Sequence, residues 1–407
     1  MRRMGSFLAA ILVSSLAAAA SGLAPLGLPL PTTPRDFLQP GTQPETLTDP
    51  IFASTNCRDC HGNYDLTMEP YGRWAGSMMA QATRDPVFHA CLAVANQDVA
   101  GAGELCLRCH APVGWLGGRS TPPDGSGLDK SKGDFDGVTC HVCHRFVDPV
   151  YDPDANPVED ADILAGLAHA PDSESHTGQY VLDPKDRRRG PFDLGHGFPW
   201  HNWLQSPYHR EAMLCANCHD VSNPTLSRQT DGTYKLNALD APHPTHRKKD
   251  EFPVERTFTE WKHSVYGRAE IDVAGRFGGN KPAVSTCQDC HLSDATGVAC
   301  KPGVGGVLRD DLPLHDFNGA NSWVVKAVRA LYPDEETGLT DDIVADALGR
   351  NQSMLERAAD LEAFRRGNDL VVRVINRGGH KLPTGYGEGR RMWLNVQFLD
   401  AGGQLLQ

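Results

Sequence analysis

Residues 140–144 read CHVCH, with two cysteines three positions apart and a histidine directly after the second. The pattern Cys-x-x-Cys-His occurs five times, as CRDCH at 57–61, CLRCH at 106–110, CHVCH at 140–144, CANCH at 215–219 and CQDCH at 287–291. Of the 12 cysteines, only Cys91 and Cys300 lie outside these pentapeptides. Five copies exceed chance and indicate one chemical task carried out five times.

The spacing of the motif suits covalent attachment of haem c. Thiols at positions i and i+3 can each add to a vinyl group of one porphyrin, and the next residue then places an imidazole under the iron. The sequence therefore predicts five haems. The predicted attachment residues are Cys57, Cys60, Cys106, Cys109, Cys140, Cys143, Cys215, Cys218, Cys287 and Cys290, and the predicted proximal iron ligands are His61, His110, His144, His219 and His291.

Two other uses of such cysteines fit less well. Ligands so close in sequence do not easily supply three corners of a zinc tetrahedron, and zinc ribbons pair their Cys-x-x-Cys units, which five copies cannot do. A redox dithiol needs one such pair on a thioredoxin-like frame rather than five in loops. We keep zinc sites and disulfides as minor alternatives.

The composition agrees with a chain that wraps cofactors. The 407 residues include 41 glycines and 29 prolines but only 7% aromatic residues, which indicates many loops and a modest side-chain core. Porphyrins would supply the missing apolar surface. The formal net charge of −12 argues against nucleic acid or an anionic membrane surface as a partner.

The N-terminal sequence predicts export. Residues 1–24 begin with two arginines, continue with an apolar run and end in small residues, which is typical of a cleaved signal peptide followed by a linker at 25–50. The apolar run is short for a membrane span, so we expect no integral span after cleavage, with an uncleaved anchor as the alternative. The expected location is the periplasm, the exterior or the cell surface.

Twelve histidines lie outside the predicted proximal positions, and we expect four or five of them to bind iron from the distal side. Segments 74–79, 203–209 and 261–266 share Trp-x-x-Ser ahead of a haem motif, and we read them as helices that cover a haem edge. The distal candidates are His89, His176, His209, His263 and His380, with Met79 as an alternative ligand.

For three further residues, His141, Cys91 and Cys300, we favour roles other than haem binding. His141 lies inside the third motif and cannot easily reach the far side of its own haem, so a role within the loop is favoured over iron ligation. Cys91 is expected to be buried and inert, although a disulfide with Cys300 is an open alternative.

The C-terminal segment has a different pattern. Residues 321–356 predict a helical connector, and 369–376 and 391–400 predict strands, the second of them with clear alternation of apolar and polar residues. We expect 357–407 to begin a β-sandwich-like domain that continues beyond Gln407, because so few strands cannot bury a sandwich core.

The motifs, together with RDPVFHACLA and SPYHREAMLCANCHDVSNP, resemble multihaem cytochromes of the c-552/c-554 type, a group related to the haem domain of hydroxylamine oxidoreductase. The resemblance covers about residues 50–300. It implies a mainly α fold with extensive loops around stacked haems, which we place at 51–320, and bis-histidine haems that pass electrons. The loop GGHKLPTGYGEG, with His380, resembles a Gly-His-x-x-Pro-Thr-Gly loop of β-sandwich modules appended to such cytochromes.

These observations favour a non-enzymatic electron carrier. Its expected partners are redox proteins, either other cytochromes or a quinol-linked membrane complex. The alternative is an oxidoreductase that acts on a small nitrogen or sulfur compound at one haem with an open coordination position. No Cys-x-x-Cys-Lys motif is present, which removes one class of nitrite reductase from that alternative. A third interpretation makes the chain a scaffold module that docks through its C-terminal segment.

Overall fold

The structure is a computed structural model that describes residues 29–195, 200–386 and 389–406. The predicted signal peptide at 1–24 lies outside the described residues. Within them, no helix has the length and apolar character needed to cross a bilayer.

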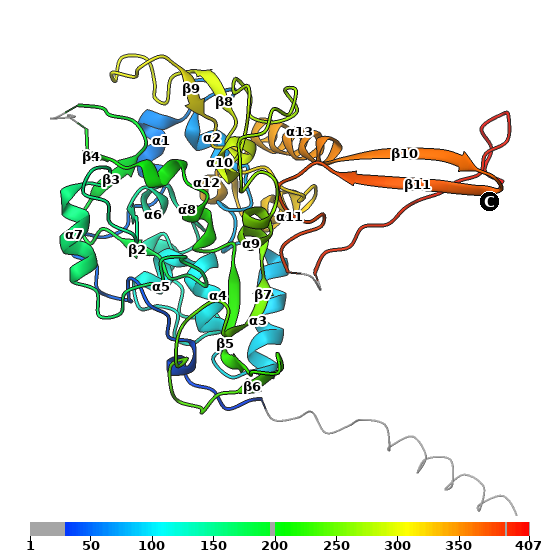
Figure 1. Ribbon diagram of the computed structural model, residues 1–407. Coiled ribbons are helices and arrows are strands. Elements are labelled where there is room, and N and C mark those ends of the chain that lie inside the picture. The colour runs from blue at the N-terminus through cyan, green and yellow to red at the C-terminus, as the bar shows by residue number, and fades with distance from the viewer. Residues whose placement is uncertain (1–28, 196–199, 387–388, 407) are drawn as a thin grey trace, which may run out of the picture.

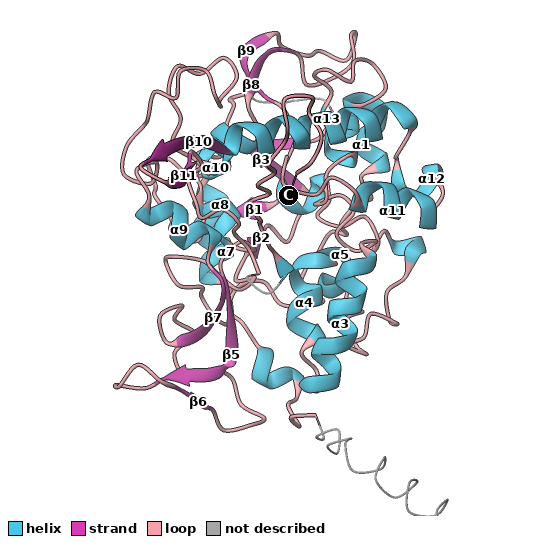
Figure 2. Cartoon of the chain, turned by 90° about the vertical axis from the view of Figure 1, so that its right-hand side faces the viewer, coloured by secondary structure: helices cyan, strands magenta, loops and turns pink. Residues whose placement is uncertain are grey.

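Short helices separated by long loops make up most of the fold (Figures 1 and 2). They are α1 (Thr55–His61), α2 (Pro70–Ala75), α3 (Pro86–Asp98), α4 (Gly103–His110), α5 (Pro112–Leu116), α6 (Cys140–Cys143), α7 (Val158–Ala165), α8 (Met213–Ala216), α9 (Thr257–His263), α10 (Cys287–His291), α11 (Val324–Leu331), α12 (Asp334–Thr337) and α13 (Asp341–Ala358). Only α3 and α13 are longer than eight residues. Proline at the first position starts α2, α3 and α5, where its missing N–H costs nothing.

The strands form small separate sheets rather than one layer. They are β1 (Phe146–Val147), β2 (Val181–Leu182), β3 (Arg187–Gly190), β4 (Asn202–Gln205), β5 (Val221–Arg228), β6 (Tyr234–Leu236), β7 (Glu251–Glu255), β8 (Asp294–Gly297), β9 (Arg309–Pro313), β10 (Ala359–Arg366) and β11 (Asp369–Asn376). The described residues contain one three-stranded sheet, in the order β6-β5-β7, while the other strands pair in twos.

The apolar core is divided into several small clusters. The largest contains Trp115, Val142, Tyr180 and Tyr208, all at most 2% exposed. Other clusters lie between α11 and α13 and around α2, α3 and α9. No single side-chain core joins these parts, as the low aromatic content predicts.

Buried arginines tie the long loops together. Arg108, inside the second motif, stacks over Trp115 at 4.2 Å and donates hydrogen bonds to the carbonyls of Gly178 and Pro40. Arg189 lies between the carboxylates of Asp160 and Asp183, at 2.6 and 2.8 Å. These buried guanidinium groups donate hydrogen bonds to buried carbonyl and carboxylate oxygens, which apolar side chains cannot do.

The C-terminal segment agrees with the expectation in part. Residues 369–376 form the expected strand, β11, which pairs with the preceding β10, and the hairpin projects away from the rest of the chain (Figure 1). Gly367, with φ +64°, closes a two-residue turn between the strands, and such a local turn costs little loop entropy.

The predicted strand 391–400 is wrong, since only an isolated bridge between Leu399 and Leu405 forms there. An extended segment needs a neighbouring strand to satisfy its backbone, and none lies beside it within the described residues. Many large apolar side chains of the hairpin and of the following segment stay at least 40% exposed, among them Leu361, Phe364, Leu370, Val374, Met392, Trp393, Leu394, Val396 and Phe398.

Candidate haem-binding site

Each of the five motifs lies on or directly after a short helix. α1, α4 and α10 end at the motif histidine, while His144 and His219 follow α6 and α8. Positions i and i+3 of a helix share a face, so both thiols of the first, second, third and fifth motifs can point toward one ring, whereas α8 ends at Ala216, before Cys218 of the fourth motif. Thr139 and Thr286 cap α6 and α10 directly before the first cysteine and fix where these helices begin. All 12 cysteines are free thiols, so the ten in the motifs remain available for thioether bonds.

Three motif histidines have one ring nitrogen fixed by a backbone carbonyl. The Nδ1–H groups of His61, His144 and His291 donate to the carbonyls of Ala299, Arg189 and Asn318, at 2.6, 2.7 and 2.7 Å. This tautomer leaves Nε2 as an unprotonated acceptor, which is the form that binds a metal. Burial also lowers the pKa of His291 to about 4 and keeps the ring neutral. The residues therefore fit a covalently attached haem with these histidines as ligands.

The other two motif histidines have different surroundings. His219 Nδ1 lies 3.5 Å from Oε1 of Glu255. Burial alone would lower the pKa of His219, but this carboxylate outweighs it and the pKa rises to about 9. His110 stacks face to face on Phe88, with ring centres 4.1 Å apart, and burial lowers its pKa to about 4.

Cysteines of different motifs lie side by side. Cys57 lies beside Cys140, Cys109 beside Cys218 and Cys215 beside Cys287, close enough for the second thiol of each pair to lower the pKa of the first or, for the last pair, for Cys215 to lower the pKa of Cys287. Cys143 also lies close to both cysteines of the fourth motif. The five motifs thus lie near one another, with the fourth beside the second and the fifth and near the third.

His380 faces the proximal histidine of the fifth motif. The rings of His380 and His291 are nearly parallel, at 9°, with centres 6.2 Å apart, and Nδ1 of His380 donates to the carbonyl of Lys381 at 2.9 Å. Two imidazoles that bind one iron from opposite sides have ring centres roughly 6 Å apart, since a metal–imidazole bond is about 2 Å long and the nitrogen is about 1 Å from the ring centre. The separation and tautomer fit a bis-histidine pair.

A strap formed by residues 377–384 holds His380 in place. Glu260 on α9 accepts hydrogen bonds from the Lys381 N–H and the Thr384 hydroxyl, at 3.0 and 2.7 Å. The Tyr266 hydroxyl donates to the carbonyl of Arg377 at 2.8 Å. Gly379 packs so closely that an added Cβ would lie 3.2 Å from the Trp261 ring, which explains a glycine beside the histidine.

Two histidines that do not belong to a motif lie beside His144. His209, a predicted distal candidate, has its ring parallel to that of His144 within 7° at 5.7 Å, and its Nε2–H donates to the carbonyl of Cys143. His315 lies 6.2 Å from His144, with Nδ1–H donating to the carbonyl of Pro313. The sequence analysis did not select His315, because no Trp-x-x-Ser segment or other repeated feature precedes it. Burial, together with the charges of Arg188, His61 and His144, lowers the pKa of His201, also not selected, to about 4.

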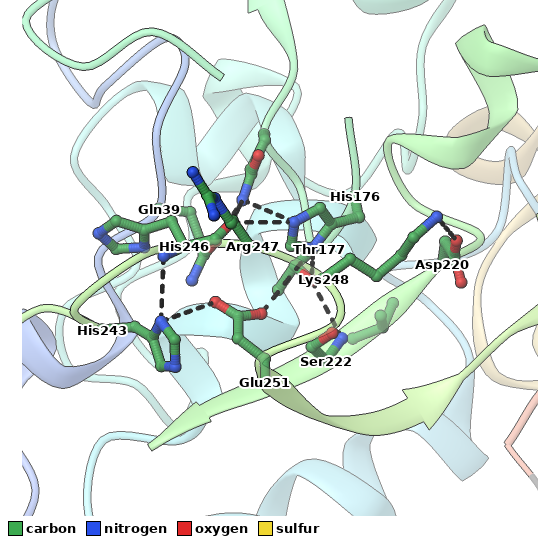
Figure 3. Close-up of polar contacts among 12 residues, drawn as sticks. Gln39, His176, Thr177, Asp220, Ser222, His243, His246, Arg247, Lys248 and Glu251 are labelled. Carbon is green, nitrogen blue, oxygen red and sulfur yellow. Dashed lines mark hydrogen bonds and ion pairs between the residues drawn. The ribbon is translucent and has the colours of Figure 1, made fainter. Parts of the chain in front are cut away.

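The other predicted distal candidates have partners or positions of another kind. His176 donates Nε2–H to the carbonyl of His246 at 3.1 Å and its Nδ1 lies 2.7 Å from the Thr177 hydroxyl, so neither nitrogen is left for iron (Figure 3). His89 lies near His110 but its Nε2–H donates to the carbonyl of Thr83 at 2.7 Å.

His263 is exposed at the end of α9, and among the described residues no motif histidine stacks with it. Met79 is half-buried, and its carbonyl accepts from the Val138 N–H just ahead of the third motif. For both, the structure offers a position but no pairing with a proximal histidine.

His141 serves its own loop. Its ring is 2% exposed and stacks on Phe52, its Nδ1 accepts from the Phe52 N–H at 2.8 Å, and its Nε2 lies 2.7 Å from Asp186. Both nitrogens are engaged, in agreement with the expected loop role. The expectation for Cys91 is wrong, since Cys91 is exposed and neither it nor Cys300 forms a disulfide.

The Trp-x-x-Ser segments share a contact in two of their three copies. The indole N–H of Trp74 donates to the carbonyl of Val138 at 3.0 Å, and that of Trp261 donates to the carbonyl of Ser285 at 2.6 Å. Each carbonyl lies two residues before the first cysteine of a motif. The helical expectation holds only for the start of the first and third segments, where α2 ends at Ala75 and α9 at His263. It is wrong for the middle segment, because Trp203 lies on β4 and bonds to Phe192 instead.

The zinc alternative gains no support from the geometry. Across the part of the chain that the structure describes, no three His, Cys, Asp or Glu side chains are arranged to hold a bare metal ion.

Comparison with known proteins supports the same chemistry for part of the chain. No curated protein and no solved structure matched the chain. Residues 56–145, which include the first three motifs, match the family model described as Cytochrome c554 and c-prime. The match supports a c-type cytochrome that carries electrons on covalently bound haem c.

Proposed function

We propose that the chain is a multihaem c-type cytochrome with five covalently attached haems, which transfers electrons outside the cytoplasm. The observation that carries the proposal is an arrangement shared by three of the five motif histidines. His61, His144 and His291 each donate Nδ1–H to a backbone carbonyl, which leaves Nε2 free to bind iron. The two motifs outside the matched residues include CQDCH at 287–291, whose histidine has this same arrangement.

Proximity of the motifs supports transfer from haem to haem. Cysteines of the first and third, second and fourth, and fourth and fifth motifs lie side by side, so macrocycles attached to them would be neighbours. Electrons pass readily between cofactors at short range, and bis-histidine ligation keeps the iron geometry similar in both oxidation states. We assign residues 51–320 to the haem domain and 357–407 to an appended β-sandwich-like domain.

The partners that fit are redox proteins, such as other cytochromes or a quinol-linked membrane complex. The acidic chain, with a net charge of −12, suits a partner with a basic docking face. The predicted signal peptide supports a location in the periplasm or at the cell surface.

The haem count tests this function. A pyridine haemochrome assay on the mature protein is expected to give five haems per chain, and replacing Cys140 and Cys143 together with alanine should remove one. Cys91→Ser and Cys300→Ser provide matched controls, since both residues lie outside the motifs and should leave the count at five. A wild-type count below five contradicts the proposal.

A second candidate function is a multihaem oxidoreductase that acts on a small nitrogen or sulfur compound. It is favoured by the surroundings of His219, against which no histidine ring packs within the described residues. A haem at this motif with an open position would bind such a compound. Electron paramagnetic resonance of the oxidised protein distinguishes the two functions, since a high-spin ferric signal supports the enzyme and exclusively low-spin signals support the carrier.

A further inference from the structure

Glu255 lies beside the fourth motif because of the strand register. β5 begins two residues after His219, and its first residue, Val221, pairs with Glu255, the last residue of β7. The Phe258 N–H then donates to the carbonyl of His219 at 2.9 Å and fixes the start of α9 against the motif. The pairing brings Oε1 of Glu255 to 3.5 Å from Nδ1 of His219.

The fourth motif is thereby different from three others. The proximal histidines of the first, third and fifth motifs donate to neutral backbone carbonyls, whereas His219 faces a carboxylate. A carboxylate draws the imidazole proton more strongly than a carbonyl and leaves more negative charge on the metal-binding nitrogen. More electron density at the proximal nitrogen stabilises the ferric form of a haem iron over the ferrous form.

The neighbours of Glu255 leave this charge in place. Its side chain is 18% exposed, and its Oε1 accepts a hydrogen bond from the Thr257 hydroxyl at 2.8 Å. The adjacent Arg256 turns away, toward Asp220 and the carbonyl of Val221. Among the described lysines and arginines, none forms an ion pair with Glu255, so His219 is its charge partner.

We infer that Glu255 is a positioning residue that acts through His219 and lowers the reduction potential of the haem on the fourth motif. The inference rests on the proposed function, because it requires a haem at Cys215 and Cys218. Since this motif lies beside the second and the fifth, an electron that passes between those two motifs would cross a haem whose reduction Glu255 makes less favourable.

The test is Glu255→Gln in the mature, haem-loaded protein. Glutamine keeps the size of the side chain and removes its charge. In a spectroelectrochemical titration, one haem component is expected to shift upward by at least tenfold in its reduction equilibrium constant, which is about 59 mV for a one-electron couple. Glu251→Gln is the matched control, because Glu251 lies on the same strand, is also buried and contacts His176 and His243 instead of a motif. This control should leave every potential unchanged.

A second variant gives the opposite sign. Thr257→Val removes the hydroxyl that attenuates the carboxylate charge, so the same component should shift downward. If the Glu255→Gln protein does not acquire its haems, the direction of the potential shift in Thr257→Val tests the inference. Unchanged potentials in Glu255→Gln with five haems bound, or an upward shift in Thr257→Val, would overturn the inference. A wild-type protein without a haem on the fourth motif would instead overturn the proposed function.

Discussion

The imidazole of His380 lies parallel to that of His291, with ring centres 6.2 Å apart, although the two residues come from different parts of the chain. His291 belongs to the last haem motif and His380 to the strap after the β10–β11 hairpin. The C-terminal segment thus places an imidazole beside the fifth motif.

His380→Ala is expected to remove the distal ligand of the haem on the fifth motif. One of the five haems should change from low-spin to high-spin in electron paramagnetic resonance, because alanine cannot bind iron. His263→Ala is the control, since His263 is exposed on neighbouring α9 and should leave the spectrum unchanged. An unaltered spectrum in His380→Ala would rule out ligation by this residue.

His141→Ala should change stability without changing the haems. The variant loses the hydrogen bonds to the Phe52 N–H and Asp186 and leaves a cavity at a buried site, which we expect to cost about 2–3 kcal/mol of unfolding free energy. The absorption and resonance spectra should stay as in the wild type. Loss of a low-spin signal in His141→Ala would show instead that this histidine binds iron.

The indole hydrogen bonds of Trp74 and Trp261 should contribute similar amounts to the free energy of unfolding. Trp74→Phe and Trp261→Phe keep most of the ring and remove the indole N–H that holds Val138 and Ser285. Each is expected to lower the unfolding free energy by roughly 1 kcal/mol, measured by chemical denaturation. Trp203→Phe loses a bond to Phe192 rather than to a residue ahead of a motif, although its ring lies 6.1 Å from that of His144, and it tests whether haem attachment depends on the first two contacts in particular. Equal haem incorporation in all three variants would contradict that dependence.

Glu251 should make stability depend on pH. Burial raises its pKa to about 7, and among the described residues neither carboxylate oxygen has a hydrogen-bond donor, although Gln39 and Ser222 lie close (Figure 3). The folded state therefore holds this proton more tightly than the unfolded state, where the pKa is about 4.3. The resulting stabilisation is complete below about pH 4 and is lost as pH rises to about 7.

Glu251→Gln should accordingly stabilise the protein above pH 7, by roughly 3 kcal/mol, and have little effect near pH 4. Thermal denaturation of variant and wild type at pH 5 and pH 8 measures the difference. Burial lowers the pKa of His176 and of His243, which face the carboxylate at 3.8 and 4.0 Å, so at pH 8 both rings are neutral and do not offset its charge. A variant that is less stable at pH 8 would contradict the prediction.

The sequence predicted the attachment residues more completely than the distal ligands. Cysteine spacing is a local property, and the motif histidine follows from it without knowledge of the fold. His315 and His201 reach His144 through loops far from that motif, so no spacing rule could select them. His176 was selected for its position in a long loop, but hydrogen bonds to Thr177 and His246 occupy its ring.

For the strands, too, local turns could be predicted from the sequence, but the pairing and register of strands could not. The turn at Gly367 is readable from sequence, yet the choice of β10 as the partner of β11 depended on which pairing closes the shorter loop. The contact between Glu255 and His219 depends on the register of β5 against β7, which neither segment reveals alone.

The strap has a further consequence for the unfolded chain. With thioether bonds at Cys287 and Cys290 and His380 on the iron, the polypeptide between them closes into a ring through the porphyrin. A cross-link that closes about 90 residues removes ~4–5 kcal/mol of chain entropy from the unfolded state in the loop-closure description of disulfides. The haem would then be a structural cross-link as well as a redox centre, and loss of His380 from the iron would remove that cross-link.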